Sequence, residues 1–172
     1  VQGYDMHWST GPNAGPLSPL RGWEGVNWEA ILQRYLALGV PREKIVMTVP
    51  FYGYEWPTVS DRPGAPTRGM ANTITYAPVS ADYLPLIRIN AQERTARHGL
   101  RRDPVSKSPY YAYRGADGWY QGWYEDAESL ASKYEFVRRE RLAGVAPTEL
   151  VSSPSLIGRA TASNRPRTGS KW

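Results

Sequence analysis

The sequence contains no cysteine and only two phenylalanines among its 172 residues. The absence of cysteine excludes disulfide bonds and thiolate metal sites. There is also no run of eighteen apolar residues, so the sequence predicts no transmembrane helix. Hydrophobic residues make up 41% and charged residues 22%, ordinary values for a globular domain with its own core.

Acidic residues are missing from the last 22 positions, although the chain carries a net charge of +5. The preceding 150 residues carry 17 basic and 16 acidic groups, so they are nearly neutral. A basic segment without interleaved aromatic residues or a known binding module does not indicate a nucleic-acid partner. The basic groups of the last segment are Arg159, Arg165, Arg167 and Lys171.

Aromatic residues with a polar group are abundant, with seven tryptophans and twelve tyrosines. Such side chains suit surfaces that are apolar in the middle and wet at the edges. Sugar rings have such surfaces, because their C–H faces stack and their hydroxyl groups form hydrogen bonds. Core packing explains any single aromatic residue equally well, but the excess over phenylalanine favours a carbohydrate ligand.

The first half of the chain predicts a βαβ unit. Residues 1–8 have the character of a short strand end, and residues 9–25 are rich in the glycine, proline, serine and asparagine of a loop. Asn27 is the expected N-cap of a helix that begins at Trp28 and stops at Gly39. Residues 45–52 form an apolar run typical of a strand covered on both faces.

Residues 57–125 interrupt this pattern and predict an antiparallel α+β insertion. Strands are expected at 110–113 and 119–124, joined by a loop over 114–118, and a helix is expected over about 80–97. Asp126 then predicts the N-cap of a helix of about fourteen residues. A last strand begins at 142–145, and Pro147 is expected to stop it. The segment after Ser152 has few apolar residues and predicts no packed structure.

Three segments, in this order and spacing, resemble the family 18 glycoside hydrolases, the chitinase-like TIM barrels. The first resembles the end of the family's sixth barrel strand and the loop after it. The second resembles the approach to the seventh strand and its Pro-Phe-Tyr-Gly end, and the third resembles the helix before the eighth strand and that strand's start. The matching residues are Tyr4-Asp5 with 15–17, 39–44 with 49–53, and 124–133 with 142–145.

This resemblance implies an α/β fold, namely the C-terminal portion of a (β/α)8 barrel from about strand 6 to strand 8. Residues 1–56 and 126–146 would belong to the barrel, and 57–125 would be the insertion that many family members carry after the seventh strand. Residues 147–172 match nothing in the family, so we expect a basic tail that arose by truncation or a shifted reading frame. The chain is accordingly expected to be the back half of a longer enzyme.

The resemblance also implies hydrolysis of β-linked N-acetylglucosamine polymers with retention, in which the substrate's acetamido oxygen attacks the anomeric carbon. Tyr4 would donate a hydrogen bond to the acetamido group, and Asp5 would bind the same sugar. Trp8, Tyr52 and Trp56 are the expected substrate-binding residues. No metal or other cofactor is implied. The motif that carries the catalytic acid, Asp-x-x-Asp-x-Asp-x-Glu, does not occur in this chain, so the chain is expected to be inactive alone.

Each of these residues has a simpler interpretation. Tyr4 and Asp5 could be a strand end with a turn-forming aspartate, and Tyr52, Trp8 and Trp56 could be core residues. At the level of function, the alternatives are a non-catalytic, lectin-like remnant and a peptidoglycan or spore-cortex hydrolase. The expected partners are an N-acetylglucosamine-containing polysaccharide and the missing N-terminal half of the barrel, with no membrane. The family's aromatic floor residue after the eighth strand is absent, because the only later tryptophan is Trp172.

Overall fold

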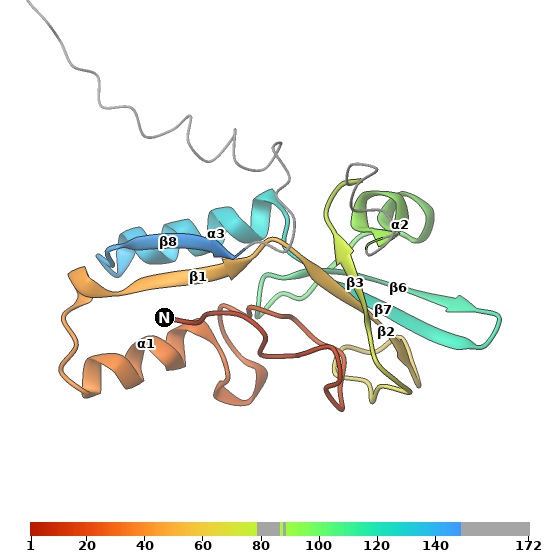
Figure 1. Ribbon diagram of the computed structural model, residues 1–172, viewed down its shortest axis with the longest axis horizontal. Coiled ribbons are helices and arrows are strands. Elements are labelled where there is room, and N and C mark those ends of the chain that lie inside the picture. Colours follow the sequence, from red (N-terminus) through yellow and green to blue (C-terminus); the bar gives the residue numbers. More distant parts are fainter. Residues whose placement is uncertain (79–86, 88, 149–172) are drawn as a thin grey trace, which may run out of the picture.

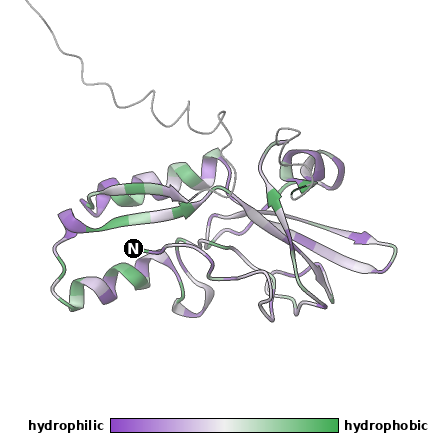
Figure 2. Cartoon of the chain, in the orientation of Figure 1, coloured by the Kyte–Doolittle hydropathy of each residue, from purple (hydrophilic) through white to green (hydrophobic). Residues whose placement is uncertain are grey.

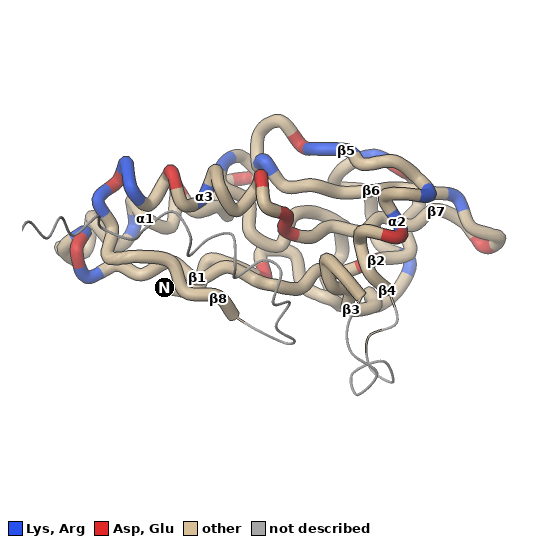
Figure 3. Tube along the Cα trace, turned by 90° about the horizontal axis from the view of Figure 1, so that it is seen from above, with Lys and Arg blue, Asp and Glu red and all other residues tan. Residues whose placement is uncertain are grey.

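Two parallel strands carry the part of the chain that the sequence assigns to a barrel. The structure is a computed structural model that describes residues 1–78, 87 and 89–148. Strand β1 (Val46–Pro50) pairs in parallel with β8 (Gly144–Thr148), with Val46 opposite Gly144 and Pro50 opposite Thr148. Helices α1 (Trp28–Ala37) and α3 (Ala127–Arg139) cover one face of this pair, and Figure 3 shows both helices on the same side of it. The short 3-10 helices η1 (Trp23–Gly25) and η2 (Arg42–Lys44) flank α1.

The barrel core lies between the two strands and the two helices. Met47, Val49 and Phe51 alternate along β1 and its end and point toward the helices. They pack with Trp28 and Leu32 of α1 and with apolar residues of α3, namely Leu130, Phe136 and Val137. Figure 2 shows β1 and β8 among the more apolar parts of the cartoon, and Figure 3 shows no charged residue on either strand. The charged side chains of the two helices lie away from this core except for Lys133 of α3, which is buried with its Nζ 5.9 Å from the Trp28 ring centroid.

Both predicted N-caps are confirmed. The Asn27 side chain accepts a hydrogen bond from the backbone N–H of Ala30, 2.9 Å away. The Asp126 side chain accepts from the N–H of Ser129, and Ser129 Oγ accepts from the N–H of Asp126, which together form a capping box. Gly39 follows α1 with a φ of 79°, the left-handed conformation that a glycine after a helix adopts at least cost.

A buried ion pair fixes α3 to the chain that precedes it. Lys133 Nζ donates to Glu125 Oε2 over 2.7 Å, and both side chains are almost completely buried. Ser129 Oγ donates to the same oxygen at 2.6 Å. Burial raises the pKa of Glu125 above its usual value, while the Lys133 ammonium opposes that shift. At this junction between the insertion and the barrel, the buried carboxylate of Glu125 is thus paired, within the described part of the chain, with Lys133 alone.

Residues 1–8 do not form the strand that the sequence predicts. The segment still lies beside β1, because the Thr48 N–H donates to the Val1 carbonyl at 3.0 Å. The next rung of a ladder fails, since the Gly3 N–H donates to Thr48 Oγ1 instead of a backbone carbonyl. Asp5 then takes a φ of 58°, which ends the extended conformation. Residues 1–8 therefore lie beside β1, as the predicted βαβ unit requires, but they do not form a strand hydrogen-bonded to it in a regular ladder.

The prediction that Pro147 stops the last strand was also wrong. β8 continues through Pro147 to Thr148, and the Phe51 N–H donates to the Thr148 carbonyl at 3.1 Å. In a parallel ladder, alternate residues direct their N–H and C=O groups to the same neighbour. Because Thr148 bonds to β1, Pro147 turns its nitrogen to the other edge of β8. No donor is needed at that position within the described pair of strands.

The insertion is a six-stranded sheet in the order β4-β3-β2-β7-β6-β5, with helix α2 (Ala91–His98) on one face. Figure 1 shows β2 leading directly out of β1, with the hairpin of β6 and β7 extending away from the barrel segment. The predicted boundary at residue 57 therefore falls inside β2. The strands are β2 (Gly53–Thr58), β3 (Asn72–Thr75), β4 (Ile89–Asn90), β5 (Arg101–Arg102), β6 (Pro109–Gly115) and β7 (Gly118–Trp123).

Two predicted elements of the insertion change in detail. The expected five-residue loop between β6 and β7 has only two residues, because Gly115 and Gly118 already pair. Gly118 has a φ of 136°, which favours glycine at the end of so tight a turn. The helix expected over 80–97 is found as α2, which begins at Ala91 after the N-cap Asn90. Residues 79–86 and 88 of that prediction lie outside the described residues. The tail predicted from residue 147 begins too early, because Pro147 and Thr148 belong to β8; its remaining residues, 149–172 with Trp172, also lie outside the described residues.

Candidate functional site

The residues predicted to form the site come together where β1 ends and the N-terminal segment lies beside it. The hydroxyl group of Tyr52 donates a hydrogen bond to Asp5 Oδ1 over 2.7 Å, across 47 positions of sequence. The ring of Tyr4 meets the ring of Tyr52 edge to face, with centroids 6.4 Å apart. Asp5 and Tyr4 are partly exposed, whereas Tyr52 is buried. Three of the five predicted residues thus form one contact group.

A close backbone approach holds Tyr4 and Asp5 in place. Trp28 Nε1 of α1 donates to the Gly3 carbonyl at 2.7 Å, and Ser18 Oγ donates to the same oxygen. A Cβ atom at position 3 would lie 2.6 Å from both Trp28 Nε1 and the Thr48 carbonyl, so only glycine fits there. The two site residues therefore follow a backbone that is fixed between α1 and β1.

Four aromatic side chains form a continuous row from the N-terminal segment into the insertion; we call it the aromatic row. Its rings meet edge to face in sequence, with centroids 6.4, 5.5 and 5.5 Å apart. Tyr54 and Trp56 lie on the same face of β2, because side chains alternate along a strand. The members of the row are Tyr4, Tyr52, Tyr54 and Trp56.

The chemistry of the row depends on neutral phenols beside a carboxylate. Burial raises the pKa of Tyr52, and the hydrogen bond to Asp5 and its charge raise it further. Burial also raises the pKa of Tyr54, with the charge of Asp5 as the second cause. Both hydroxyl groups thus stay protonated and available as donors well above neutral pH.

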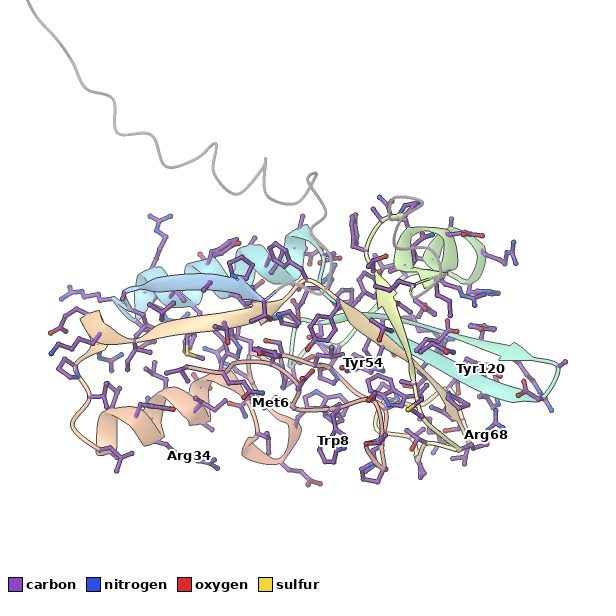
Figure 4. All side chains as sticks on the ribbon, viewed as in Figure 1. Met6, Trp8, Arg34, Tyr54, Arg68 and Tyr120 are labelled. Atoms are coloured by element: carbon purple, nitrogen blue, oxygen red, sulfur yellow. The ribbon has the colours of Figure 1, made fainter. Side chains whose placement is uncertain are left out.

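The structure separates the two tryptophans that the sequence treats alike. Trp8 is 50% exposed, whereas Trp56 is completely buried. Trp56 therefore has no free ring face on which a sugar could stack in this structure. Its indole nitrogen instead donates to the Trp8 backbone carbonyl over 3.3 Å. Figure 4 shows Trp8 on the N-terminal loop and Tyr54 deeper in the molecule, on β2.

His7, between the two candidate site residues Asp5 and Trp8, is held as a structural side chain. Its Nδ1 lies 2.9 Å from the Pro16 carbonyl, and its ring meets Trp23 edge to face. Burial lowers the pKa of His7, so the imidazole is held in its neutral form. A Cβ atom at Gly15 would collide with this ring, which shows how closely the loop packs on it.

Sequence reasoning missed a second polar centre on the opposite face of the insertion sheet. Glu55 is buried and accepts hydrogen bonds from the hydroxyl groups of Tyr111 and Tyr113, at 2.7 and 3.2 Å. Arg94 of α2 pairs with it, with Nε 3.1 Å from Oε2. The signal available in the sequence was Glu55 itself, an acidic residue between Tyr54 and Trp56. Through Arg94, this buried acid attaches α2 to the sheet.

Two kinds of feature are absent from the residues that the structure describes. No group of three or more histidine, cysteine, aspartate or glutamate side chains that could hold a metal occurs among residues 1–78, 87 and 89–148. In the same part of the chain, no helix is long and apolar enough to cross a membrane. The groups gathered at the site are tyrosine hydroxyl donors, the Asp5 carboxylate and the half-exposed Trp8 indole ring.

Taken together, a pair of parallel strands with two covering helices, an α+β insertion after β1 and a Tyr-Asp pair beside the end of β1 define part of an α/β barrel. The chain belongs to the glycosyl hydrolases family 18, whose family description matches residues 1–147. The resemblance found in the sequence is confirmed, and the α/β fold matches part of the family's TIM barrel.

The chain is similar in sequence to a bacterial and a human protein. It is 26% identical over 145 residues to the cortical fragment-lytic enzyme of Bacillus subtilis, which covers 83% of this chain and 28% of that protein. It is 27% identical over 124 residues to human di-N-acetylchitobiase, which covers 64% of this chain and 30% of that protein. The chain thus spans about three tenths of the length of these relatives.

Solved structures agree on the fold. The chitinase of Cycas revoluta in complex with allosamidin superposes with a TM-score of 0.68 at 22% identity, over 86% of this chain and 40% of that chain. A chitinase-like agglutinin from Robinia pseudoacacia gives a TM-score of 0.69 at 21% identity, over 94% and 45% of the two chains. A further structure of the Cycas enzyme holds (GlcNAc)3.

Proposed function

We propose that this chain supplies one wall of a site for N-acetylglucosamine polymers and that the complete site performs substrate-assisted, retaining hydrolysis. The observation that carries the proposal is the contact group of Tyr4, Asp5 and Tyr52 in a chain of family 18. A hydroxyl donor, a carboxylate and an aromatic ring lie together beside the barrel segment. They suit the amide, hydroxyl and C–H groups of an acetamido sugar.

Within this proposal, each side chain has a separate task. The Tyr4 hydroxyl donates to the acetamido oxygen and aims it at the anomeric carbon. As positive charge develops at that carbon, Asp5 stabilises it and accepts a hydrogen bond from the sugar. Tyr52 orients the carboxylate by donating to Oδ1, which leaves Oδ2 for the ligand. Asp5 has a φ of 58°, the kind of strained backbone that proteins retain at working sites.

The proton donor must come from outside the chain. Hydrolysis requires an acid that protonates the leaving oxygen, and the Asp-x-x-Asp-x-Asp-x-Glu motif does not occur here. We therefore propose that the chain alone binds the glycan without cleaving it. The missing strands would pair with the open edge of β8 and with the N-terminal segment, as the two ends of about strands 6 to 8 of the barrel.

Two other functions remain candidates for specific reasons. A lectin-like role is favoured by the half-exposed Trp8 in a chain without the acid motif. A peptidoglycan or spore-cortex substrate is favoured by the similarity to the cortical fragment-lytic enzyme, since cell-wall glycans contain the same acetamido sugar. The substrate class is shared by all three proposals, and only the fate of the bound glycan differs.

Paired assays test the proposal. Hydrolysis of a chromogenic chitobiose is measured for the chain and for Tyr4→Phe, and retention on insoluble chitin is measured for the chain and for Trp8→Ala. We expect retention that Trp8→Ala weakens, with no turnover in either sample. Turnover above that of Tyr4→Phe would refute the inactivity of the chain, and absence of retention on chitin and on peptidoglycan would refute the binding function.

A further inference from the structure

The buried Trp56 has a polar contact that its position in the core does not require. Its ring is fully buried against Tyr54, and its Nε1–H donates to the carbonyl of the half-exposed Trp8, 48 positions away. The same carbonyl also accepts the Gly11 N–H at 2.8 Å. We propose that Trp56 is a positioning residue, which holds the exposed Trp8 as a preformed platform for a sugar ring. The sugar as the ligand of Trp8 rests on the proposed function, whereas the contact between Trp56 and Trp8 does not depend on it.

The part of the loop that directly follows Trp8, residues 9–14, is attached to the insertion. Backbone hydrogen bonds link this loop to residues 64–71 in antiparallel order; we call them the loop ladder. Its bonds join Ala71 N to Ser9 O (2.8 Å), Thr67 N to Pro12 O (2.8 Å), Ala14 N to Ala65 O (3.0 Å) and Gly64 N to Ala14 O (3.1 Å). Thr67 Oγ1 adds a bond to the Gly11 carbonyl at 2.8 Å. Trp56 is the contact that extends this ladder to Trp8 itself.

This arrangement makes the platform independent of the missing barrel strands. The hydrogen bonds to the Trp8 carbonyl come from Gly11 in its own turn and from Trp56 of the insertion, and the residues that follow Trp8 bond to residues 64–71. A platform fixed before the ligand arrives loses less conformational freedom on binding than one ordered by the ligand. The insertion therefore does more than flank the site: through Trp56 it presets one of the surfaces that contact the sugar.

The substitution Trp56→Phe tests the role, because it keeps a large aromatic ring and removes only the indole donor. Trp123→Phe is the matched control. Trp123 is also fully buried on the same face of the sheet, but its Nε1 donates to Gln121 Oε1 at 3.0 Å and not to Trp8. Trp56→Phe leaves the Trp8 carbonyl its bond from the Gly11 N–H, whereas Trp123→Phe removes the donor of the buried Gln121 Oε1, so the control should lose at least as much stability.

The first readout is the order of Trp8 in the ligand-free protein, measured from its assigned indole N–H signal by heteronuclear NMR. We expect Trp56→Phe to broaden or split this signal and Trp123→Phe to leave it unchanged. This result does not depend on any glycan. An unchanged Trp8 signal in a folded Trp56→Phe variant would overturn the inference.

The second readout is the affinity for tetra-N-acetylchitotetraose, measured by calorimetry. Freeing one aromatic side chain should weaken binding about threefold to tenfold in Trp56→Phe, with no change in Trp123→Phe and the largest loss in Trp8→Ala. Equal affinities of Trp56→Phe and the unchanged chain would contradict the positioning role. Absence of binding by the unchanged chain would instead refute the proposed function, while the NMR result would still decide the inference.

Discussion

At the scale of single residues, the site depends on Asp5 being charged beside neutral tyrosines. Tyr52 donates to Asp5 at 2.7 Å, and burial together with this carboxylate raises the pKa of Tyr52. Asp5→Asn would keep an acceptor for the hydroxyl, and asparagine tolerates the left-handed backbone at this position. The substitution therefore separates the charge of the site from its shape.

We expect Asp5→Asn to lower the pKa of Tyr52 toward its ordinary value, because the negative charge next to the phenol is gone. The fold should persist, with an unfolding free energy within about 1 kcal/mol of the unchanged chain. Carbon-13 NMR of labelled tyrosine follows the titration, and Tyr52→Phe assigns the signal. A Tyr52 pKa that stays as high in Asp5→Asn would show that Asp5 does not influence it.

Raised tyrosine pKa values also predict how stability depends on pH. Tyr52 and Tyr111 have pKa values above normal in the folded chain, and burial raises the pKa of Tyr113 to about 12. The unfolded value is about 10. The stabilisation is complete below pH 10 and is lost as the pH rises through the folded values. Urea unfolding between pH 8 and 11.5 should show this decline, and a flat profile would contradict it.

At the scale of elements, α3 is fixed by its cap at one end and by its buried lysine further along. Asp126 caps the helix and also receives Arg102, with Nη2 2.7 Å from Oδ2. Lys133 neutralises Glu125 inside the protein. The two contacts differ in kind. Asp126 combines a helix cap with a partly exposed ion pair to Arg102, whereas the Lys133–Glu125 pair is buried away from water.

The cap and the ion pair of Asp126 can be separated by two substitutions. Asp126→Asn keeps the side-chain acceptor for the Ser129 N–H but removes the charge that Arg102 binds. Asp126→Ala removes both, so it should lower the free energy of unfolding by about 1 kcal/mol more than Asp126→Asn. Urea denaturation followed by circular dichroism gives both values. Equal losses would mean that the cap contributes nothing.

Removing the lysine should be far more damaging. Lys133→Met leaves Glu125 buried without its partner, and a loss of about 3 to 5 kcal/mol is expected from urea denaturation. The double variant Glu125→Gln/Lys133→Met removes both charges and should recover most of that loss. If the double variant is no more stable than Lys133→Met, the uncompensated charge is not the cause.

Local signals made most elements predictable, whereas contacts between distant residues were not. Asn27 and Asp126 each carry their own capping chemistry, so the sequence located both helix starts. The residues next to Trp56 in the sequence do not show that it is buried while Trp8 is exposed. Its burial depends on the N-terminal loop, which the fold brings against it. The partners of Glu55 lie 39 to 58 positions away, beyond the reach of any pattern. Pro147 was misjudged because the free edge of β8 becomes visible only with the pairing.

At the scale of the whole molecule, the described residues form two sheets of unequal size. The insertion has six strands and buries aromatic residues on both faces, whereas the barrel segment has one described pair of parallel strands. Strand pairs with open edges are weakly protected. The family motifs made the α/β class of the barrel segment predictable, and its β1-β8 pair is expected to be less stable than the sheet of the insertion.

Hydrogen exchange should reveal this difference directly. We expect amides in β6 and β7 to exchange through the largest opening free energies and amides in β8 to exchange much faster. Mass spectrometry of peptides from the two regions gives the comparison within one sample. Equal protection of β7 and β8 would contradict the expectation and indicate that β8 is paired on both edges in solution.

The central claim is that the chain alone presents a preformed wall for acetamido sugars. Titration of the isotope-labelled chain with tetra-N-acetylchitotetraose, followed by NMR of the backbone amides, tests it most directly. We predict that the signals of Tyr4, Asp5 and Trp8 shift together and saturate with one dissociation constant, while those around Glu55 stay in place. Absence of shifts at millimolar ligand, or shifts confined to the face of the sheet that carries Glu55, would contradict the claim.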